Sequence, residues 1–383
     1  MSRRTASNLV RIGLDADLIT GAKTGIGRYV FELLKALEIQ LPNAEFYLYS
    51  QFPVAMPSNS GRWIARVDPH ANRIKHIAWL KLRCGAMCKR DGVDVFWATA
   101  TMFPALAESV RRVSTVYDLN HKIVPETMPV ATLWAYRLFF ARDVRSADAV
   151  TAISQGTSDK LKQYVGRSAD VIVHPAADAA LARAADADIA RVRAKYAIFS
   201  PYLLAVATLE PRKNLGLLID VFTSLKQGNS LPHNYELLLV GGKGWKDSEL
   251  SRKIEAGRAL GVRTLGFLPD EDLTPFYSGC EAFLFPSLYE GFGMPVLEAR
   301  ACGARVLATD IPEIREAGGP DTHYCKPDFA SLRGGILSVL GSPVRRSADQ
   351  LTTWHEAAKV FAPVLLGHKS VLQPEGQKVT CPR

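Results

Sequence analysis

The chain has few cysteines, and their spacing fits neither a metal site nor a disulfide framework. No two of them form a C-x-x-C pair, and the six are Cys84, Cys88, Cys280, Cys302, Cys325 and Cys381. This pattern excludes zinc-finger folds and small disulfide-stapled folds. We expect reduced thiols, with Cys84 and Cys88 buried together because residues four apart share one face of a helix.

The sequence also lacks a long apolar run. No stretch approaches the ~18 apolar residues that a membrane-spanning helix requires. The first residues, MSRRTASNLVRIG, carry charge but contain no apolar core of a secretory signal. We therefore expect a cytoplasmic protein, either free or peripheral on the inner face of the cytoplasmic membrane.

Several motifs are absent, and each absence argues against a class of protein. The glycine-rich residues 21–29, GAKTGIGRY, do not have the G-x-G-x-x-G spacing of a dinucleotide site, which disfavours an NAD-dependent dehydrogenase. We expect no DxD-type acidic cluster at the end of a strand, and therefore no metal site. The basic segments have no interleaved aromatic residues for stacking bases, so we expect no nucleic-acid partner.

Positive charge is present in excess and is unevenly distributed. The net charge is +9, and residues 1–180 contain 23 Lys and Arg against 16 Asp and Glu. Residues 62–90 are the most basic part, with eight cations and only Asp68 in opposition, and the spacing of the apolar residues from Ile74 to Met87 predicts a helix. Two interpretations of this predicted helix remain open. It lies on an anionic membrane surface, or it packs on a sheet and leaves its charges in water.

Short apolar runs alternate with amphipathic segments along the whole chain. Strands are predicted near residues 9–16, 93–99, 113–117, 149–153, 171–175, 202–207, 236–242, 264–269, 282–285 and 305–309. This alternation predicts an α/β protein with two Rossmann-like, doubly wound parallel sheets. We expect one domain over residues 1–180, a second over 181–345, and a crossover helix at 354–366 followed by a loose tail at 373–383.

The segment after the strand at 282–285 is the most informative part of the sequence. Gly291 and Gly293 interrupt regular structure, and Pro295 suits the first turn of a helix because its missing N–H is not needed there. Glu290 precedes this helix and Glu298 lies about one turn inside it. Such an offset favours gripping two ends of one long ligand over the acid and nucleophile roles of a glycosidase, which face one bond.

Two cations stand at another strand end, in the segment Glu210-Pro211-Arg212-Lys213-Asn214. Cations at the start of a helix oppose its dipole unless an anion lies nearby, so Arg212 and Lys213 predict an anion site. A departing diphosphate gains negative charge as its bond breaks, and two fixed cations stabilise that transition state more than the ground state.

These segments together resemble one family. The Glu-x7-Glu pair around GFGMP, the EPRKN segment and TGIGRY resemble the motifs of family 4 retaining glycosyltransferases. The resemblance implies the GT-B fold and metal-independent transfer of a hexose, with retention, from a nucleotide sugar that is a substrate rather than a cofactor. The motifs look like those of bacterial mannosyltransferases of surface polysaccharide synthesis. That likeness implies GDP-mannose first, a UDP-sugar as the alternative, and a lipid-linked or growing saccharide as acceptor.

The resemblance also implies roles for individual residues. Glu290 would meet the donor sugar, Glu298 the ribose hydroxyls, and Arg212 with Lys213 the diphosphate. Donor-loop residues would hold sugar and phosphate oxygens largely through backbone amides, and these are Gly291, Phe292, Gly293, Met294 and Pro295. The resemblance assigns roles in three further segments. Gly25 and Gly27 would lie near the diphosphate and the acceptor, Gly266 and Phe267 would lie near the base, and Asp118 is a candidate catalytic residue.

One departure from the family pattern leaves alternatives open. The strand-end segment Tyr117-Asp118-Leu119 resembles a His-Asp-Leu motif, but Tyr117 stands where the family has the histidine that lies against the donor sugar. His121 is not the matching residue. This departure keeps open a non-catalytic nucleotide-sugar-binding partner protein. A sugar-nucleotide epimerase of the same fold is disfavoured because no matching His or Asp motif is present.

Overall fold

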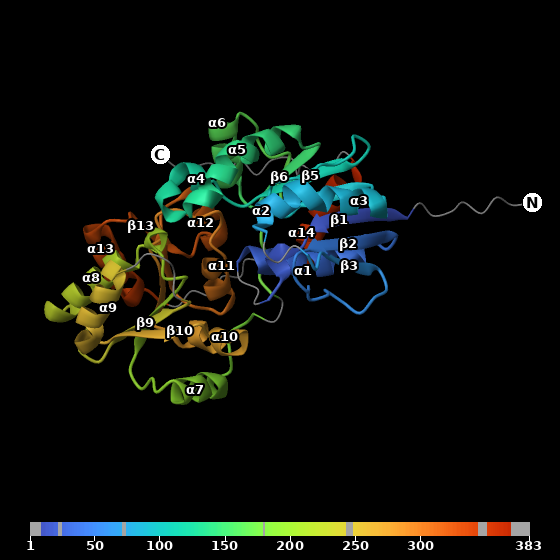
Figure 1. Cartoon of the computed structure of the whole chain (residues 1–383). Coiled ribbons are helices and arrows are strands. Elements are labelled where there is room, and N and C mark those ends of the chain that lie inside the picture. Colours follow the sequence, from blue (N-terminus) through green and yellow to red (C-terminus); the bar gives the residue numbers. More distant parts are fainter. Residues whose placement is uncertain are drawn as a thin grey trace, which may run out of the picture.

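The computed structural model describes residues 9–21, 25–70, 74–178, 181–242, 248–343 and 351–368. They form two parallel β-sheets, each with helices packed around it (Figure 1). This confirms the predicted α/β architecture. The predicted tail at 373–383 and Cys381 lie outside the described residues. Cys84 and Cys88 are buried free thiols on one helical face, as expected, with their Sγ atoms 3.9 Å apart.

The first sheet has seven parallel strands in the order β3-β2-β1-β4-β5-β6-β7. They are β1 (Val10–Asp15), β2 (Ala44–Ser50), β3 (Trp63–Val67), β4 (Val95–Ala98), β5 (Arg111–Val116), β6 (Ala149–Ala152) and β7 (Val171–Ile172). The strand order reverses between β1 and β4. In open parallel sheets this reversal places a crevice at the carboxyl ends of the strands.

The second sheet repeats this order with six parallel strands, β10-β9-β8-β11-β12-β13. They are β8 (Tyr202–Val206), β9 (Glu236–Val240), β10 (Val262–Gly266), β11 (Ala282–Phe285), β12 (Val306–Thr309) and β13 (His323–Cys325). Its order reverses between β8 and β11. The two strand ends that carry Arg212 and Glu290 are therefore neighbours, although 78 residues separate them in the chain.

Helices connect the strands in both halves. Those of the first half are α1 (Ile26–Gln40), α2 (His76–Trp79), the π-helix η2 (Leu80–Cys84), α3 (Gly85–Asp91), α4 (Asn120–Ile123), α5 (Val130–Ser146) and α6 (Gln155–Val165). Those that follow are α7 (Asp186–Lys195), α8 (Leu215–Gln227), α9 (Ser248–Gly257), α10 (Asp270–Gly279), α11 (Met294–Ala301), α12 (Pro312–Gly318), α13 (Phe329–Gly341) and α14 (Trp354–Leu366). Short 3₁₀ turns are η1 (Asp17–Ile19), η3 (Pro125–Thr127), η4 (Pro211–Lys213) and η5 (Arg258–Leu260).

The helix predicted from the apolar residues at 74–87 is confirmed, but the start of the basic segment 62–90 is not helical. Residues 63–67 are the edge strand β3, and helical structure begins only at His76. Several of the cations are used inside the protein: Arg62 donates to backbone carbonyls, Arg66 pairs with Asp91, and Arg83 pairs with Asp68. Charge periodicity alone could not reveal these partners, because they lie on other elements.

Helix α14 carries the chain from the second sheet back to the first. Thr353 and Glu356 form a capping box at its start. Phe361 is fully buried and contacts Trp97 of β4 edge to face, with ring centroids 4.9 Å apart. Arg111 of β5 donates to the carbonyl of Val364. The exact domain boundaries remain a prediction.

Candidate active site

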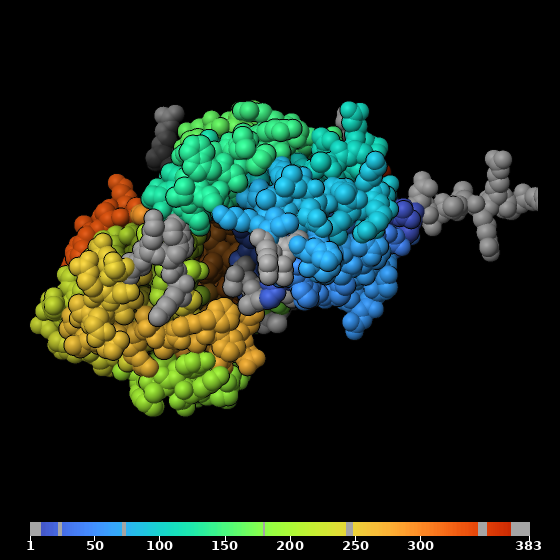
Figure 2. Space-filling view, viewed as in Figure 1, coloured from blue at the N-terminus to red at the C-terminus, as the bar shows by residue number. Residues whose placement is uncertain are grey.

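A cavity of about 440 Å³ lies between the two halves, at the carboxyl ends of their central strands. Figure 2 shows the hollow between the blue half and the gold half. The first half contributes residues from the start of α1 and the end of β5. The second half contributes η4 and the loop before α11, so most predicted site residues meet here: Gly25, Asp118, Arg212, Lys213, Phe267, Glu290, Gly291, Phe292, Gly293, Met294 and Pro295.

The loop before α11 fits tightly against the first half. A Cβ at Gly291 would lie 2.0 Å from the carbonyl oxygen of Tyr117, so only glycine fits there. The carbonyl of Gly291 accepts hydrogen bonds from Ser154 Oγ (2.7 Å) and Thr157 Oγ1 (3.1 Å) of the other half. Gly293 has φ +105° and no side-chain cap, which leaves the start of α11 open toward the cavity.

Glu290 lies between the two predicted cations. Lys213 Nζ donates to its Oε1 at 2.6 Å, and Arg212 Nη1 donates to its Oε2 at 2.8 Å. Burial by itself would raise the pKa of Glu290, but the adjacent charges of Lys213 and Arg212 overcome it and lower the pKa to about 2. Glu210 holds the other edge of Arg212. The result is a fixed, mostly buried charge cluster facing the cavity.

Asp118 and Tyr117 approach the same cavity from the end of β5. Asp118 accepts hydrogen bonds from the backbone and side-chain nitrogens of Asn120. Burial raises the pKa of Asp118, and the charges of Arg212 and Lys213 counteract this only in part. The hydroxyl of Tyr117 is buried and has no hydrogen-bond partner in the described part of the chain. A buried polar atom without a partner is uncommon in proteins, and this one belongs to a residue that lines the cavity.

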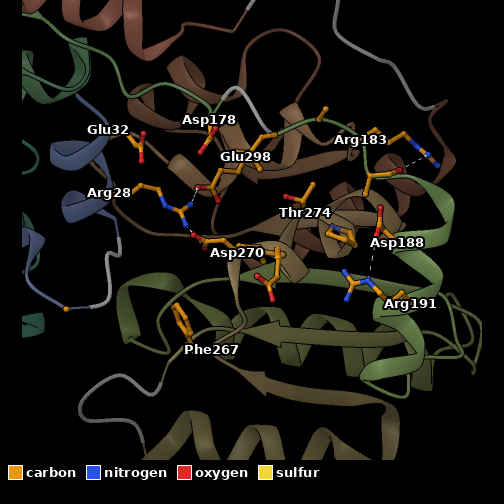
Figure 3. A pocket seen from close by; sticks show the side chains of 17 residues that line it. Arg28, Glu32, Asp178, Arg183, Asp188, Arg191, Phe267, Asp270, Thr274 and Glu298 are labelled. Atoms are coloured by element: carbon orange, nitrogen blue, oxygen red, sulfur yellow. Dashed lines mark hydrogen bonds and ion pairs between the residues drawn. The ribbon is translucent and has the colours of Figure 1, made fainter. Parts of the chain in front are cut away.

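Glu298 faces a second cavity of about 910 Å³, which shares Phe267 with the first. Figure 3 shows Arg28 extending from α1 toward Glu298 and Asp270. Its Nη1 donates to Glu298 at 3.0 Å, and it also pairs with Asp270. Burial raises the pKa of Glu298, while Arg28 and the hydroxyl of Tyr277 counteract the rise. The two glutamates thus serve adjacent compartments, and Arg28 reaches one of them across the halves.

The remaining predicted glycines have different surroundings. Gly25 lines the smaller cavity and precedes α1. Gly27 packs against the carbonyl of Leu18, 2.3 Å from where a Cβ would lie, and lines neither cavity. Gly266 has φ +72° and turns the chain so that Phe267 lines both.

Sequence reasoning missed two groups near the site. Asp15, the last residue of β1, and Asp17 form a DxD pair, so the expectation that no such pair occupies a strand end is wrong. His76 Nε2 lies 2.9 Å from Asp15 and 3.6 Å from Asp17. Arg28 is the other missed residue. It is part of the TGIGRY segment, but only the structure shows that it pairs with Glu298. His121, by contrast, lies among the rings of Tyr136 and Phe140, away from the cavity.

Residues 188–347, which carry this donor loop and both glutamates, match the family model described as Glycosyl transferases group 1. The O-antigen chain mannosyltransferase B of Escherichia coli is 30% identical over 335 residues, covering 83% of this chain and 87% of that protein. The chain belongs to the group 1 glycosyltransferases. The serotype-specific mannosyltransferase WbdA of Escherichia coli is also 30% identical to this glycosyltransferase, over 197 residues that cover 49% of the chain and 24% of WbdA.

Solved structures agree on the GT-B fold of this glycosyltransferase. WaaG, a glycosyltransferase involved in lipopolysaccharide biosynthesis, superposes with a TM-score of 0.69 at 17% identity, covering 92% of this chain and 95% of WaaG. Anabaena HepE in complex with UDP-glucose gives 0.65 at 18% identity, with 93% and 94% covered. Within the described ranges, no helix of this glycosyltransferase is both long and apolar enough to span a bilayer.

Proposed function

We propose that this glycosyltransferase moves mannose from GDP-mannose to a lipid-linked or growing saccharide, with retention at the anomeric carbon and without a metal ion. The observation that carries the proposal is the cluster of Arg212, Lys213 and Glu290 beside the open start of α11, in a cavity between the two halves. A leaving diphosphate in that cavity meets two cations and free backbone amides, which is what its growing charge requires.

We assign the remaining roles from the positions of the residues and from the family resemblance. Glu290 holds the donor sugar while neutralising part of the cationic pair, and Glu298 in the neighbouring cavity takes the ribose hydroxyls. Asp118 lines the smaller cavity together with the donor loop, and we assign its carboxylate to the reacting sugar. The unpartnered hydroxyl of Tyr117 supplies a hydrogen bond at the position where the family has a histidine. We assign Gly266 and Phe267 to the contact with the base, because Phe267 lines both cavities.

The choice of mannose rests on the relatives. The two Escherichia coli relatives are mannosyltransferases by name. A UDP-sugar is the second candidate donor, because a fold neighbour was solved with UDP-glucose. The lipid-linked acceptor rests on the same relatives, since one of them is named for the O-antigen chain. An enzyme with such an acceptor would act at the inner face of the cytoplasmic membrane.

We propose that transfer needs no metal ion because the protein supplies positive charge at the diphosphate site. Arg212 and Lys213 supply the positive charge that a cation would otherwise bring to the diphosphate. The DxD pair Asp15 and Asp17, together with His76, offers a set of possible metal ligands, but these residues line neither donor cavity. A chelator therefore should not reduce transfer.

The test is turnover with purified protein. GDP-mannose and UDP-glucose are supplied in parallel with a saccharide acceptor, and released nucleoside diphosphate and the anomeric configuration of the product are measured with and without EDTA. We expect GDP release and an α-linked product in both conditions. Release of UDP but not GDP would show that the donor is a UDP-sugar rather than GDP-mannose. Binding of either nucleotide sugar without any turnover would favour a non-catalytic partner protein.

A further inference from the structure

Helix α5 exposes an apolar surface that the catalytic site does not use. Its first ten residues, VATLWAYRLF, include one charged side chain, Arg137, and none of the ten is buried. The buried residues of this helix, Phe140, Asp143 and Val144, all lie in its second half. A helix that is apolar on most sides is normally enclosed by protein or lipid. The part of the chain that the structure describes leaves the first half of α5 open to solvent.

The most exposed apolar side chains of this region lie on α5 and on the neighbouring η2. Val130, Trp134 and Leu138 are 69%, 64% and 67% exposed and are spaced four residues apart, so they lie along one stripe of α5. Leu82 of η2, beside the same helix, is 80% exposed. These four account for most of the six large apolar side chains that are at least 64% exposed in the described ranges. We call them the apolar crest.

A groove of about 940 Å³ runs behind the crest, between α5 and the segment α2–η2. Most of its wall is apolar, and the walls include Ile77, Leu80, Leu82, Ala135 and Phe139. Lys81 joins the two walls, because it pairs with Asp143 of α5 and lies 4.7 Å from the ring centroid of Phe139. The groove is therefore a built feature of the first half, with room for hydrocarbon.

Cations surround this apolar surface. Arg142 continues the crest stripe, Lys75 lines the groove, and Lys122 precedes α5; all three are exposed. The guanidinium of Arg137 lies 5.5 Å from the ring of Trp134. Aromatic and aliphatic side chains bordered by Lys and Arg suit the interface of an anionic bilayer, where the chains enter the lipid and the cations meet the headgroups.

We propose that the apolar crest and its flanking cations dock this glycosyltransferase on an anionic bilayer surface. The proposal deepens the proposed function in that it places the membrane contact for a lipid-linked acceptor. It also moves the contact from the whole of residues 62–90 to α5 and the segment 75–82, because Arg62, Arg66 and Arg83 have partners within the protein. A second copy of the chain fits less well, since a self-complementary contact would bring like charges together.

Vesicle binding tests the apolar part. Wild type and a Trp134→Glu/Leu138→Glu double variant are sedimented with phosphatidylcholine vesicles, with and without phosphatidylglycerol. Wild type should bind the anionic vesicles more tightly, and the double variant should lose at least about tenfold in affinity, because two apolar side chains no longer enter the lipid. Phe199→Glu is the matched control, since Phe199 is 82% exposed in the second half of the chain.

Charge reversal tests the electrostatic part. Arg137→Glu should weaken binding to anionic vesicles only, and salt should weaken wild-type binding, whereas Arg258→Glu, an equal charge change on η5, should not alter it. Wild-type binding by the crest variant, or equal losses in the controls, would overturn the proposal. So would sedimentation showing that the crest variant separates a dimer instead. Release of nucleoside diphosphate with a soluble acceptor is measured in every variant, so failure of the membrane contact and failure of the catalytic proposal are seen separately.

Discussion

Glu290 shows at the scale of one residue why this site needs all of its charges. The side chain is 7% exposed, and an isolated carboxylate so deeply buried would lose its charge. Because its pKa is lowered from 4.5 to about 2, Glu290 contributes stability above pH 4.5 and loses that contribution as pH falls toward 2. The same pairing holds Arg212 and Lys213 in place before any ligand arrives.

The first prediction concerns the two cations. Arg212→Ala and Lys213→Ala should each lower kcat by roughly 100-fold or more, equivalent to about 2.7–4 kcal/mol, because the leaving diphosphate loses a preorganised charge partner. Steady-state release of nucleoside diphosphate measures this. Lys253→Ala is the control, since Lys253 pairs with Asp220 outside both cavities. An unchanged kcat in either variant would remove that cation from the mechanism.

The second prediction concerns the hydroxyl of Tyr117. Tyr117→Phe should leave the melting temperature unchanged or slightly higher, because the buried hydroxyl has no partner within the described residues. If the hydroxyl bonds the donor sugar, kcat/KM should fall by an amount equivalent to about 0.5–1.5 kcal/mol. Calorimetry and initial rates measure the two effects. A large loss of stability with unchanged kcat/KM would show that the hydroxyl acts only in folding.

At the scale of elements, the loop before α11 and the start of α6 form one unit across the cleft. Ser154 caps α6 by accepting from the amide of Thr157, and its hydroxyl also donates to the carbonyl of Gly291. Glu316 of α12 accepts from the amides of Gln155 and Gly156 at the same helix start. The donor loop is therefore positioned by the other half of the molecule as well as by its own.

The third prediction follows from that close approach. Gly291→Ala places a Cβ 2.0 Å from the Tyr117 carbonyl, so the loop must move away from the first half. We expect a stability loss of about 1–3 kcal/mol and a strong reduction in kcat, measured by denaturant unfolding and by turnover. Gly334→Ala in α13 is the matched control, because nothing lies within 4 Å of its added Cβ. The control should be neutral or stabilising.

The fourth prediction concerns the link between α2 and the end of β1. Burial by itself would lower the pKa of His76, but Asp15 and Asp17 raise it from 6.5 to about 9. The protonated ring therefore stabilises the fold below pH 6.5, and this contribution is lost as pH rises through about 9. His76→Gln should remove the fall in melting temperature between these values. A wild-type profile in the variant would assign that fall to another group.

At the scale of the whole molecule, the cleft exists because two sheets present their carboxyl ends to each other and several contacts join them. Arg28 bridges to Glu298 and Asp270, and the hydroxyl of Tyr289 accepts from the amide of Leu119. Helix α14 also links the halves, because the chain passes through it from the second sheet back to the first. Neither half could form the donor cavity alone, because both line it.

The fifth prediction tests how firmly α14 packs against the first half. Phe361→Ala should cost about 3–5 kcal/mol of unfolding free energy, since it empties a fully buried position against Trp97. Chemical denaturation measures the change, and Phe329→Ala serves as the control because Phe329 is 42% exposed. A small loss for Phe361→Ala would show that α14 is only loosely attached to the first half.

The elements that were predictable share a local cause. Strand β11, the glycine turn and the start of α11 follow from apolar runs, Gly291 and Pro295, all within one short segment. The strand β3 was hidden by the basic residues around it, because their charges are neutralised by partners such as Asp91 on another element. The DxD pair after β1 was visible in the sequence, but only the fold brings His76 to it.

The sequence by itself determined the family, the GT-B fold class and the motif residues around Glu290 and Arg212, because motif spacing and apolar periodicity are properties of contiguous residues. Only the tertiary structure decided which charges meet, Glu290 with Lys213 and Arg28 with Glu298, and that the buried hydroxyl of Tyr117 is left without a partner in the described residues. The physical reason is that these energies depend on distance and burial between residues far apart in the chain. Position along the sequence fixes neither quantity.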